Sequence, residues 1–216
     1  MLVNLAEHDS IANRFVAELR NVEWQKDRMR FRRNLERLGE VFAYEISRTL
    51  EYEPYEIETP LGVANTSLPA QRVVVATILR AGLPLQQGLL NFFDAAEGAF
   101  VAAYRLHHKD GTFEIRVDYV TAPDLTDCVL LLTDPMLATG ASINVALQEL
   151  GRYGRPAATH VVSAIASSAG VDAVRRLHPQ ARLWLGAVDE ELTAKGYIVP
   201  GLGDAGDLAY GEKGSQ

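Results

Sequence analysis

From residue 70 onward the chain alternates short apolar runs with segments of helical periodicity, and this alternation is its most constraining feature. Runs such as Val73-Val74-Val75 and Val129-Leu130-Leu131-Leu132 are continuously apolar. Such strands are typical of a parallel sheet that helices cover on both faces. The sequence therefore predicts an α/β fold with a mostly parallel sheet flanked by helices, in which ligands bind beyond the carboxyl ends of the strands.

The expected elements are placed by the apolar runs and by three-and-four spacing between them. We expect strands at residues 72–79, 98–104, 113–119, 128–134, 159–166 and 182–188, and helices at 85–96, 142–153 and 170–177. Two helices should precede them, one capped by Asp9-Ser10 and ending near Asn21, and a longer one over 24–50. Residues 51–69, interrupted by prolines and a glycine, predict a connector or arm with a strand near 55–58.

Length and composition exclude several classes of protein. The 216 residues suit one large domain, and 48% hydrophobic with 23% charged residues is the balance of an ordinary globular protein. The formal net charge of −7 argues against general affinity for nucleic acid. The single cysteine, Cys128, excludes an internal disulfide and is expected to be inert core. With no leader or membrane-spanning pattern, a cytoplasmic location is expected.

Basic residues crowd the first half of the 24–50 helix, at Lys26, Arg28, Arg30, Arg32, Arg33 and Arg37. Such a run is usually a solvated helix face. An oligomer contact and an anion site are the alternatives.

The strongest chemical signal lies in residues 129–142, where an apolar strand runs through a loop into a helix that Ser142 is expected to open. The small residues Thr139, Gly140 and Ser142 let backbone N–H groups and hydroxyls approach a phosphate at the positive end of the helix dipole. Asp134, at the end of the strand, is expected to accept hydrogen bonds from sugar hydroxyls. The alternative is a tight strand-to-helix turn with a capping serine.

Two arginines follow successive apolar runs. Arg80 follows the 72–79 run and precedes a glycine turn, and Arg105 follows the 98–104 run. Each alone is more often an ion-pair partner. Two guanidinium groups and a phosphate loop at one edge of a sheet, however, favour a ligand with phosphates at two places.

Residues 197–207 form a glycine-rich segment with a literal G-x-G-x-x-G between Gly201 and Gly206. A dinucleotide site is excluded, because that motif needs a following helix, a second strand and an acidic residue about 20 positions on. We expect a helix-averse segment whose backbone groups read a small, flat, polar ligand, with Asp204 and Asp207 nearby. His107 and His108 precede a Lys-Asp-Gly turn, where a solvent-exposed loop is favoured over a metal or base site.

Together, four motifs resemble the uracil phosphoribosyltransferases, a family of type I phosphoribosyltransferases. They occur in the family's order and are Ile78-Leu79-Arg80-Ala81-Gly82-Leu83, Tyr104-Arg105, the 134–142 loop and the 197–207 segment. The 32–44 helix and Thr59-Pro60-Leu61 in the arm extend the resemblance over nearly the whole chain. The Asp134-Pro135 pair separates this family from other phosphoribosyltransferases, which usually carry two adjacent acidic residues there. Gly140 is followed by Ala141 where many relatives have a second glycine, which costs little if Ala141 keeps a negative φ.

The resemblance implies one domain over 1–216, with N-terminal helices and an arm in 1–69, a core sheet in 70–190 and a small C-terminal, base-binding hood in 191–216. It implies transfer of the phosphoribosyl group from 5-phospho-α-D-ribose 1-diphosphate (PRPP) to uracil, giving UMP and diphosphate. Mg²⁺ would be carried by the substrate's diphosphate, with no metal held by protein ligands alone.

The resemblance also implies roles for individual residues. The catalytic residues would be Arg80 and Arg105, which hold the diphosphate, and Asp134, which holds the ribose hydroxyls. The remaining PRPP-binding residues would be Pro135, Met136, Leu137, Ala138, Thr139, Gly140, Ala141, Ser142 and Asp204, with the 5-phosphate bound by the last six residues of the loop. Uracil would be bound by Ile198, Gly203, Asp204 and Ala205.

Two other functions compete with this one. A phosphoribosyltransferase for another base is disfavoured by the length and sequence of residues 197–207. A pyrimidine-responsive RNA-binding regulator on the same fold would need a basic face, for which the 26–37 cluster is the candidate. The resemblance further predicts a homodimer or higher homo-oligomer, with the 51–69 arm as a candidate contact. The acidic charge and the lack of a membrane-spanning run predict no nucleic-acid or membrane partner.

Overall fold

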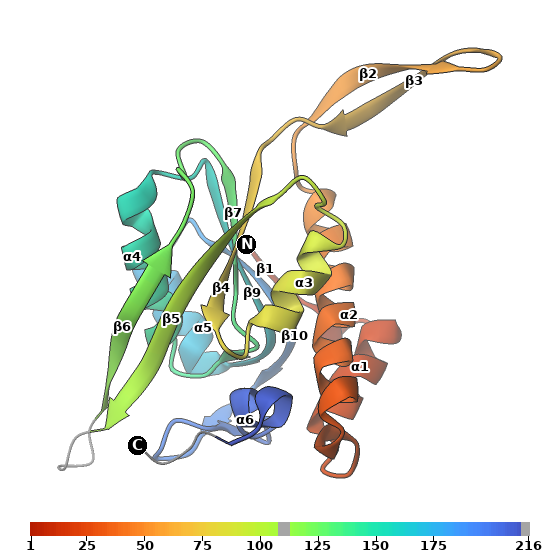
Figure 1. The fold of residues 1–216 in the computed structure, drawn as a ribbon. Helices are drawn as coiled ribbons and strands as arrows, with labels where there is room; N and C mark the ends of the chain where they lie inside the picture. Colours follow the sequence, from red (N-terminus) through yellow and green to blue (C-terminus); the bar gives the residue numbers. More distant parts are fainter. Residues whose placement is uncertain (108–112, 213–216) are drawn as a thin grey trace.

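A mostly parallel sheet runs through the centre of the protein, as predicted (Figure 1). The computed structural model describes the backbone of residues 1–107 and 113–212, and side chains in these ranges except at 105–107, 113 and 114. Within this part the sheet has eight strands. Seven follow the order β1 (Leu2–Asn4), β10 (Arg182–Asp189), β9 (Ala158–Ser167), β7 (Val129–Thr133), β4 (Val73–Leu79), β5 (Glu97–His107) and β6 (Phe113–Thr121), and β8 (Met136–Leu137) pairs with β9. Each of these pairings is parallel except that of β5 with β6.

Helices cover both faces of the sheet, which explains the continuously apolar strands. Val73 and Val75 of β4 pack in one core with α1 (Ile11–Arg20), α2 (Arg28–Ser47) and α3 (Leu83–Leu90). Val74 and Ala76 face the opposite core, built with α4 (Ala141–Leu150) and α5 (Ser168–Leu177). Burying both faces removes the polar alternation of a half-exposed strand. Cys128 is fully buried, as expected for a core residue.

The N-terminal helices begin where side chains cap them. Ser10 Oγ accepts a hydrogen bond from the Ala12 N–H at 3.2 Å and starts α1, as predicted. Asp27 caps α2 by accepting from the Arg30 N–H, so the long helix begins four residues later than expected, at Arg28, after a 3₁₀ turn. No helix in the described residues is both long and apolar enough to cross a membrane.

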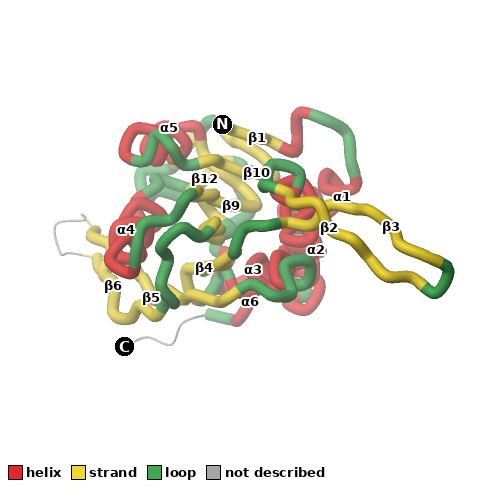
Figure 2. The backbone as a smooth tube through the Cα atoms, turned by 90° about the horizontal axis from the view of Figure 1, so that it is seen from above, coloured by secondary structure: helices red, strands yellow, loops and turns green. Residues whose placement is uncertain are grey.

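Further differences from expectation concern α3, the 51–69 segment and the first residues of the chain. The 85–96 helix is wrong in both bounds: α3 spans Leu83–Leu90, and just beyond its end the Phe92 N–H bonds to the Leu89 carbonyl three residues back. The 51–69 segment holds two strands instead of one, β2 (Tyr52–Thr59) and β3 (Gly62–Pro69), paired as an antiparallel hairpin. Figures 1 and 2 show this hairpin projecting away from the rest of the protein. Strand β1 was not expected, since three residues carry no visible period; its pairing with β10 stabilises it.

A buried histidine lies in the centre of the sheet. His160 of β9 is fully buried, and its Nδ1 accepts a hydrogen bond of 2.9 Å from Trp184 Nε1 on β10. Its Nε2 has no hydrogen-bond partner in the described part of the chain. Burial, reinforced by the nearby positive charge of Arg182, lowers the pKa of His160 from 6.5 to about 4. The folded protein therefore holds this imidazole neutral at physiological pH.

The titration of His160 should make stability depend on pH. Between about pH 6.5 and 4 the unfolded chain binds a proton at this position that the folded chain does not, so the free energy of unfolding should fall with falling pH, by up to about 3 kcal/mol. Urea unfolding measured across this range checks the slope. His160→Gln keeps an acceptor for Trp184 but cannot titrate, so its slope should be shallower. An unchanged slope, or a wild-type imidazole that titrates near 6.5 by NMR, would contradict the assignment.

Candidate functional site

The sheet reverses its strand order between β4 and β7, and candidate site residues follow both strands. The chain continues from β4 to β5 on one side, while β7 leads to β9 on the other. Ligands of open α/β sheets bind at such a switch point, beyond the carboxyl ends of the strands. Arg80 comes directly after β4 and Asp134 directly after β7. The structure thus brings these two predicted residues to the same edge.

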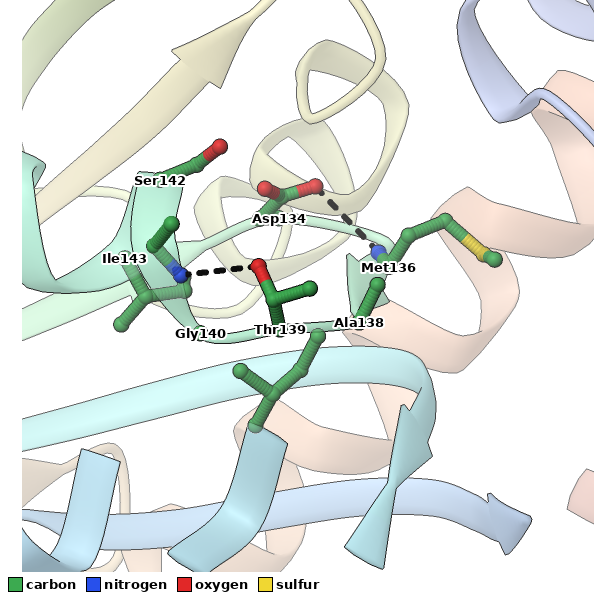
Figure 3. A pocket seen from close by; sticks show the side chains of 9 residues that line it. Asp134, Met136, Ala138, Thr139, Gly140, Ser142 and Ile143 are labelled. Atoms are coloured by element: carbon green, nitrogen blue, oxygen red, sulfur yellow. Dashed lines mark hydrogen bonds between the residues drawn. The ribbon is translucent and has the colours of Figure 1, made fainter. Parts of the chain in front are cut away.

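The 134–142 segment forms the predicted strand–loop–helix cradle. A small pocket is lined by Asp134 and by residues 136–143, and Figure 3 shows the Asp134 and Ser142 side chains on the same side of the loop. Gly140 has a φ of 78° and is the N-cap of α4. The helix therefore begins at Ala141, one residue before the expected start at Ser142, and because its cap is a glycine the alternative of a capping serine is wrong. Ala141 does not have a positive φ, so it fits where relatives have glycine.

The backbone of this loop leaves polar groups for a ligand. The N–H groups of the first turn of α4 have no partners within the helix, as at any helix start. The Thr139 Oγ1 lies 3.4 Å from the Ala141 N–H that donates to it. Asp134 accepts a hydrogen bond from the Met136 N–H at 3.2 Å, and this residue has further interactions. Donors and a carboxylate therefore lie at opposite ends of one short loop.

Two serines of β9 hold the loop in place, and sequence reasoning missed both. Ser163 Oγ donates to the Asp134 carbonyl at 2.6 Å, and Ser167 Oγ donates to the Ala138 carbonyl at 2.5 Å. Ser167 also accepts from the Gly170 N–H, where α5 begins. A Cβ on Gly170 would lie 2.3 Å from the Ala138 carbonyl oxygen, so α5 packs directly against the loop. The signal was present as Ser163, a polar residue inside an apolar run.

Arg80 lies between the sheet and the C-terminal segment. Its Nη2 is 3.4 Å from Asp207 Oδ1 and donates to the Gly211 carbonyl at 3.2 Å. Arg80 and Asp207 are each at least one-third exposed, so a competing anion can reach the guanidinium group. Gly82, two residues after Arg80, packs directly against β7, since a Cβ there would lie 2.9 Å from the Thr133 carbonyl oxygen.

The C-terminal segment forms a small hood over this edge, but it is not helix-averse as expected. Helix α6 (Ala205–Tyr210) occupies its second half, because Asp204 accepts hydrogen bonds from the Gly206 and Asp207 N–H groups at 2.9 and 3.1 Å and caps it. Before it, β11 (Glu191–Leu192) pairs with β12 (Ile198–Val199). Sequence reasoning missed the cap because the surrounding glycines concealed the Asp-x-x-Asp start.

The predicted base-binding residues have different exposures. Ile198 and Ala205 are buried, whereas Gly203 is exposed, with a φ of 96°, and a Cβ there would meet only Leu208 at 3.8 Å. The hood is fastened to α2 by Arg32, which donates to the Ala209 carbonyl at 2.7 Å and lies over the Tyr210 ring. The backbone of Gly203 is thus accessible, while Ile198 and Ala205 on either side of it are buried.

One predicted site residue and one predicted loop lie at the edge of the described structure. The backbone of Arg105 lies in β5 opposite Ile115, and its side chain is outside the described part, so its role stays a prediction. His107 is the last residue of β5, which corrects its expected place in a loop. His108 lies outside the described residues.

Comparisons with known proteins agree with this geometry. The family model for uracil phosphoribosyltransferase matches residues 6–212. The uracil phosphoribosyltransferase of Porphyromonas gingivalis is 50% identical over 98% of this chain and 99% of its own, and that of Pyrococcus furiosus is 38% identical over 91% and 84%.

Solved structures show the same fold. The AQ2163 protein from Aquifex aeolicus superposes with a TM-score of 0.87 at 31% identity, covering 98% of both chains. A hypoxanthine phosphoribosyltransferase from Staphylococcus aureus reaches 0.50 at 11% identity over 73% of this chain and 74% of its own, which supports the fold alone. The switch-point site, the phosphate cradle and these likenesses lead to one assignment: the chain belongs to the uracil phosphoribosyltransferase family.

Proposed function

We propose that the protein transfers the 5-phosphoribosyl group of PRPP to N1 of uracil, so that UMP forms and diphosphate leaves. The observation that carries the proposal is the 134–142 cradle, which lies at the same sheet edge as Arg80 and beneath a hood with accessible backbone. Such a site suits a ligand with a phosphate at one end and a planar base at the other. Membership of the uracil phosphoribosyltransferase family indicates that this base is uracil.

The loop, Asp134 and Arg80 are each suited to a different part of PRPP. The loop at residues 137–142 is suited to the 5-phosphate, because small side chains and the start of α4 expose N–H groups there. Asp134 is placed to accept hydrogen bonds from the ribose hydroxyls. Arg80, with Arg105 as its expected partner, is suited to the diphosphate through charge-assisted hydrogen bonds.

Mg²⁺ fits this arrangement as a companion of the substrate. Among the described residues no group of three or more His, Cys, Asp or Glu side chains gathers to hold a metal. Mg²⁺ is commonly bound by one or two carboxylates together with substrate phosphates, and Asp134 lies at the right edge for such a contact. Bound in this way, Mg²⁺ would neutralise charge on the diphosphate.

The chemistry requires positioning and charge stabilisation more than a strong base. Displacement at the anomeric carbon builds positive charge on the ribose ring and negative charge on the departing diphosphate. Arg80 stabilises the second of these charges. Ile198 and Gly203 present backbone groups to the edge of uracil, and Asp204, as the cap of α6, supports the same segment.

The basic cluster of α2 does not favour the RNA-binding alternative, because most of its side chains have partners within the chain. Arg30 pairs with Glu18, Arg33 with Glu36 and Glu40, and Lys26 with Glu23. Arg32 holds α6 and Arg37 donates to Asn34. Lys26, Arg30 and Arg33 are paired with carboxylates, and charges compensated in this way attract a phosphate backbone less than unpaired ones do. Arg32 and Arg37 bond to uncharged acceptors, so the paired residues carry this argument.

The projecting β2–β3 hairpin supports a homodimer. Tyr55, Ile57 and Leu68 are exposed on one face, while the other face carries Glu56, Glu58 and Asn65 together with exposed Tyr52 and Val63. A lone two-stranded hairpin is marginally stable in water, so an apolar face of this kind is expected to be covered. We infer that a second copy of the chain covers it.

We also place the enzyme in the cytoplasm, where a reducing environment suits the single buried Cys128.

The proposed reaction is tested by the choice of base. Purified protein with Mg²⁺ and PRPP should form a nucleotide from uracil and not from cytosine, orotate, hypoxanthine or adenine, followed by chromatography of the products. Product from another base would keep the phosphate site but overturn the base assignment. RNA retained on filters, with no nucleotide formed from any base, would favour the regulator.

Arg80 should matter far more than the aspartate beside it. Loss of charge-assisted hydrogen bonds in Arg80→Gln should raise the KM for PRPP about ten- to a hundredfold. Asp207→Asn is the matched control: an exposed ion pair contributes about 0–1 kcal/mol, so the KM should change by no more than about fivefold. Steady-state kinetics at varied PRPP measures both. Equal effects of the two variants would argue that Arg80 holds the hood and not the diphosphate.

The hairpin contact can be tested by placing a charge on either face. Ile57→Asp puts a carboxylate on the apolar face and should shift the protein toward monomer in sedimentation-velocity runs. Asn65→Asp adds the same charge to the opposite face, where Asn65 pairs with Glu56, and should leave the distribution unchanged. A dimer that withstands Ile57→Asp would place the interface elsewhere.

A further inference from the structure

A charged pair joins the end of α1 to the end of β10. Arg20 is the last residue of α1 and Asp189 the last of β10. Their side chains form two parallel hydrogen bonds, each of 2.8 Å, from Nη1 to Oδ2 and from Nη2 to Oδ1. The Asp189 side chain is only 8% exposed and that of Arg20 only 24%. A paired fork of this kind has a defined geometry as well as a high energy.

The same two side chains hold both polar groups of one glycine in the hood. The Gly201 N–H donates to Asp189 Oδ2 at 2.9 Å, and Arg20 Nη1 donates to the Gly201 carbonyl at 3.0 Å. Three segments distant in sequence thus meet at Gly201. Gly201 lies between Ile198 and Gly203, whose backbone groups are assigned to uracil above.

The conformation of Gly201 links its hydrogen bonds with Arg20 and Asp189 to the orientation of Ile198. Gly201 has a φ of 56°, and a Cβ there would lie 2.2 Å from the Ile198 carbonyl oxygen. The chain therefore turns back sharply, and the orientation of the Ile198 peptide depends on that of Gly201. The strand pairing of this part of the hood is short, since the β11–β12 ladder has two residue pairs.

The pair remains ionised at neutral pH. Burial alone would raise the pKa of Asp189, but the hydrogen bonds from Arg20 and from the Gly201 N–H outweigh it and lower the pKa. Buried ion pairs often add little stability compared with apolar residues of the same size. We therefore expect the Arg20–Asp189 pair to act mainly by fixing the position of the backbone it contacts, and not by adding stability.

We propose that Arg20 and Asp189 are positioning residues for base recognition: they clamp Gly201 and thereby orient the backbone that reads the uracil edge. The proposal rests on the function proposed above. The phosphate cradle has its own anchors in Ser163 and Ser167, so the clamp should affect the base and leave PRPP binding intact.

Steady-state kinetics of Arg20→Gln, Asp189→Asn and the double variant test the clamp. We expect the KM for uracil to rise about tenfold or more, while kcat at saturating uracil and the KM for PRPP stay within about threefold. Because both residues act on one glycine, the double variant should lose about as much as either single variant. Arg20→Lys, which keeps the charge but not the fork, should be intermediate.

Arg72→Gln is the matched control. Arg72 also pairs with a carboxylate, Glu97 at 2.7 Å, and donates to the Asp124 carbonyl, but it lies at the opposite edge of the sheet. Its loss should leave both KM values unchanged. If the Arg20 and Asp189 variants lower kcat and raise both KM values in parallel, or leave the uracil KM unchanged, the clamp has no specific role and the proposal is wrong.

Hydrogen exchange separates this proposal from the proposed function. The amides of residues 198, 199 and 201–203 should exchange faster in the clamp variants than in the wild type, while those of residues 134 and 136–142 are unaffected. If the wild type uses a base other than uracil, the function proposed above fails, and the same KM comparison is made on that base. Unaltered exchange at 198–203 in a folded variant overturns the clamp in either case.

Discussion

The structure depends on burying both faces of a parallel sheet. Each apolar strand must be covered twice, so α1 to α3 pack on one side and α4 and α5 on the other. Parallel strands need long crossover connections, and each of these connections leaves the sheet at the carboxyl edge of its strand. Arg80, Asp134 and the 134–142 loop therefore lie together because of how the core is covered, before any ligand is considered.

Long-range polar contacts then fix the parts that the core cannot hold. Ser163 and Ser167 reach from β9 to the carbonyl groups of the phosphate loop. Arginines do the same for the hood: Arg20 at Gly201, Arg32 at Ala209 and Arg80 at Gly211. Apolar residues of the hood, such as Ile198, Leu202 and Ala209, are buried in the core, and the hydrogen bonds to its backbone add the directional contacts that fix its orientation. The basic character of the first helices serves this purpose.

Much of the fold and part of the site were predictable from local patterns. The buried strands and the cradle were visible because a continuous apolar run needs cover on both faces, and small residues at a strand end leave backbone groups accessible. The expected start of α4 was one residue late, since Gly140 has the left-handed conformation that begins the helix at Ala141. The hood was predicted to be helix-averse because of its glycines, but Asp204 caps α6 within the glycine-rich stretch.

The sequence by itself determined the α/β class, the two-sided sheet and the strand–loop–helix arrangement of residues 129–142, because each follows from the residue types within one short window. Tertiary structure decided which distant side chains act on that loop and on the hood. Ser163 is 29 residues from the Asp134 it supports, and Asp189 is 169 residues from Arg20. A window of local periodicity contains no information about such pairs. Only the order of the strands brings them within hydrogen-bonding distance.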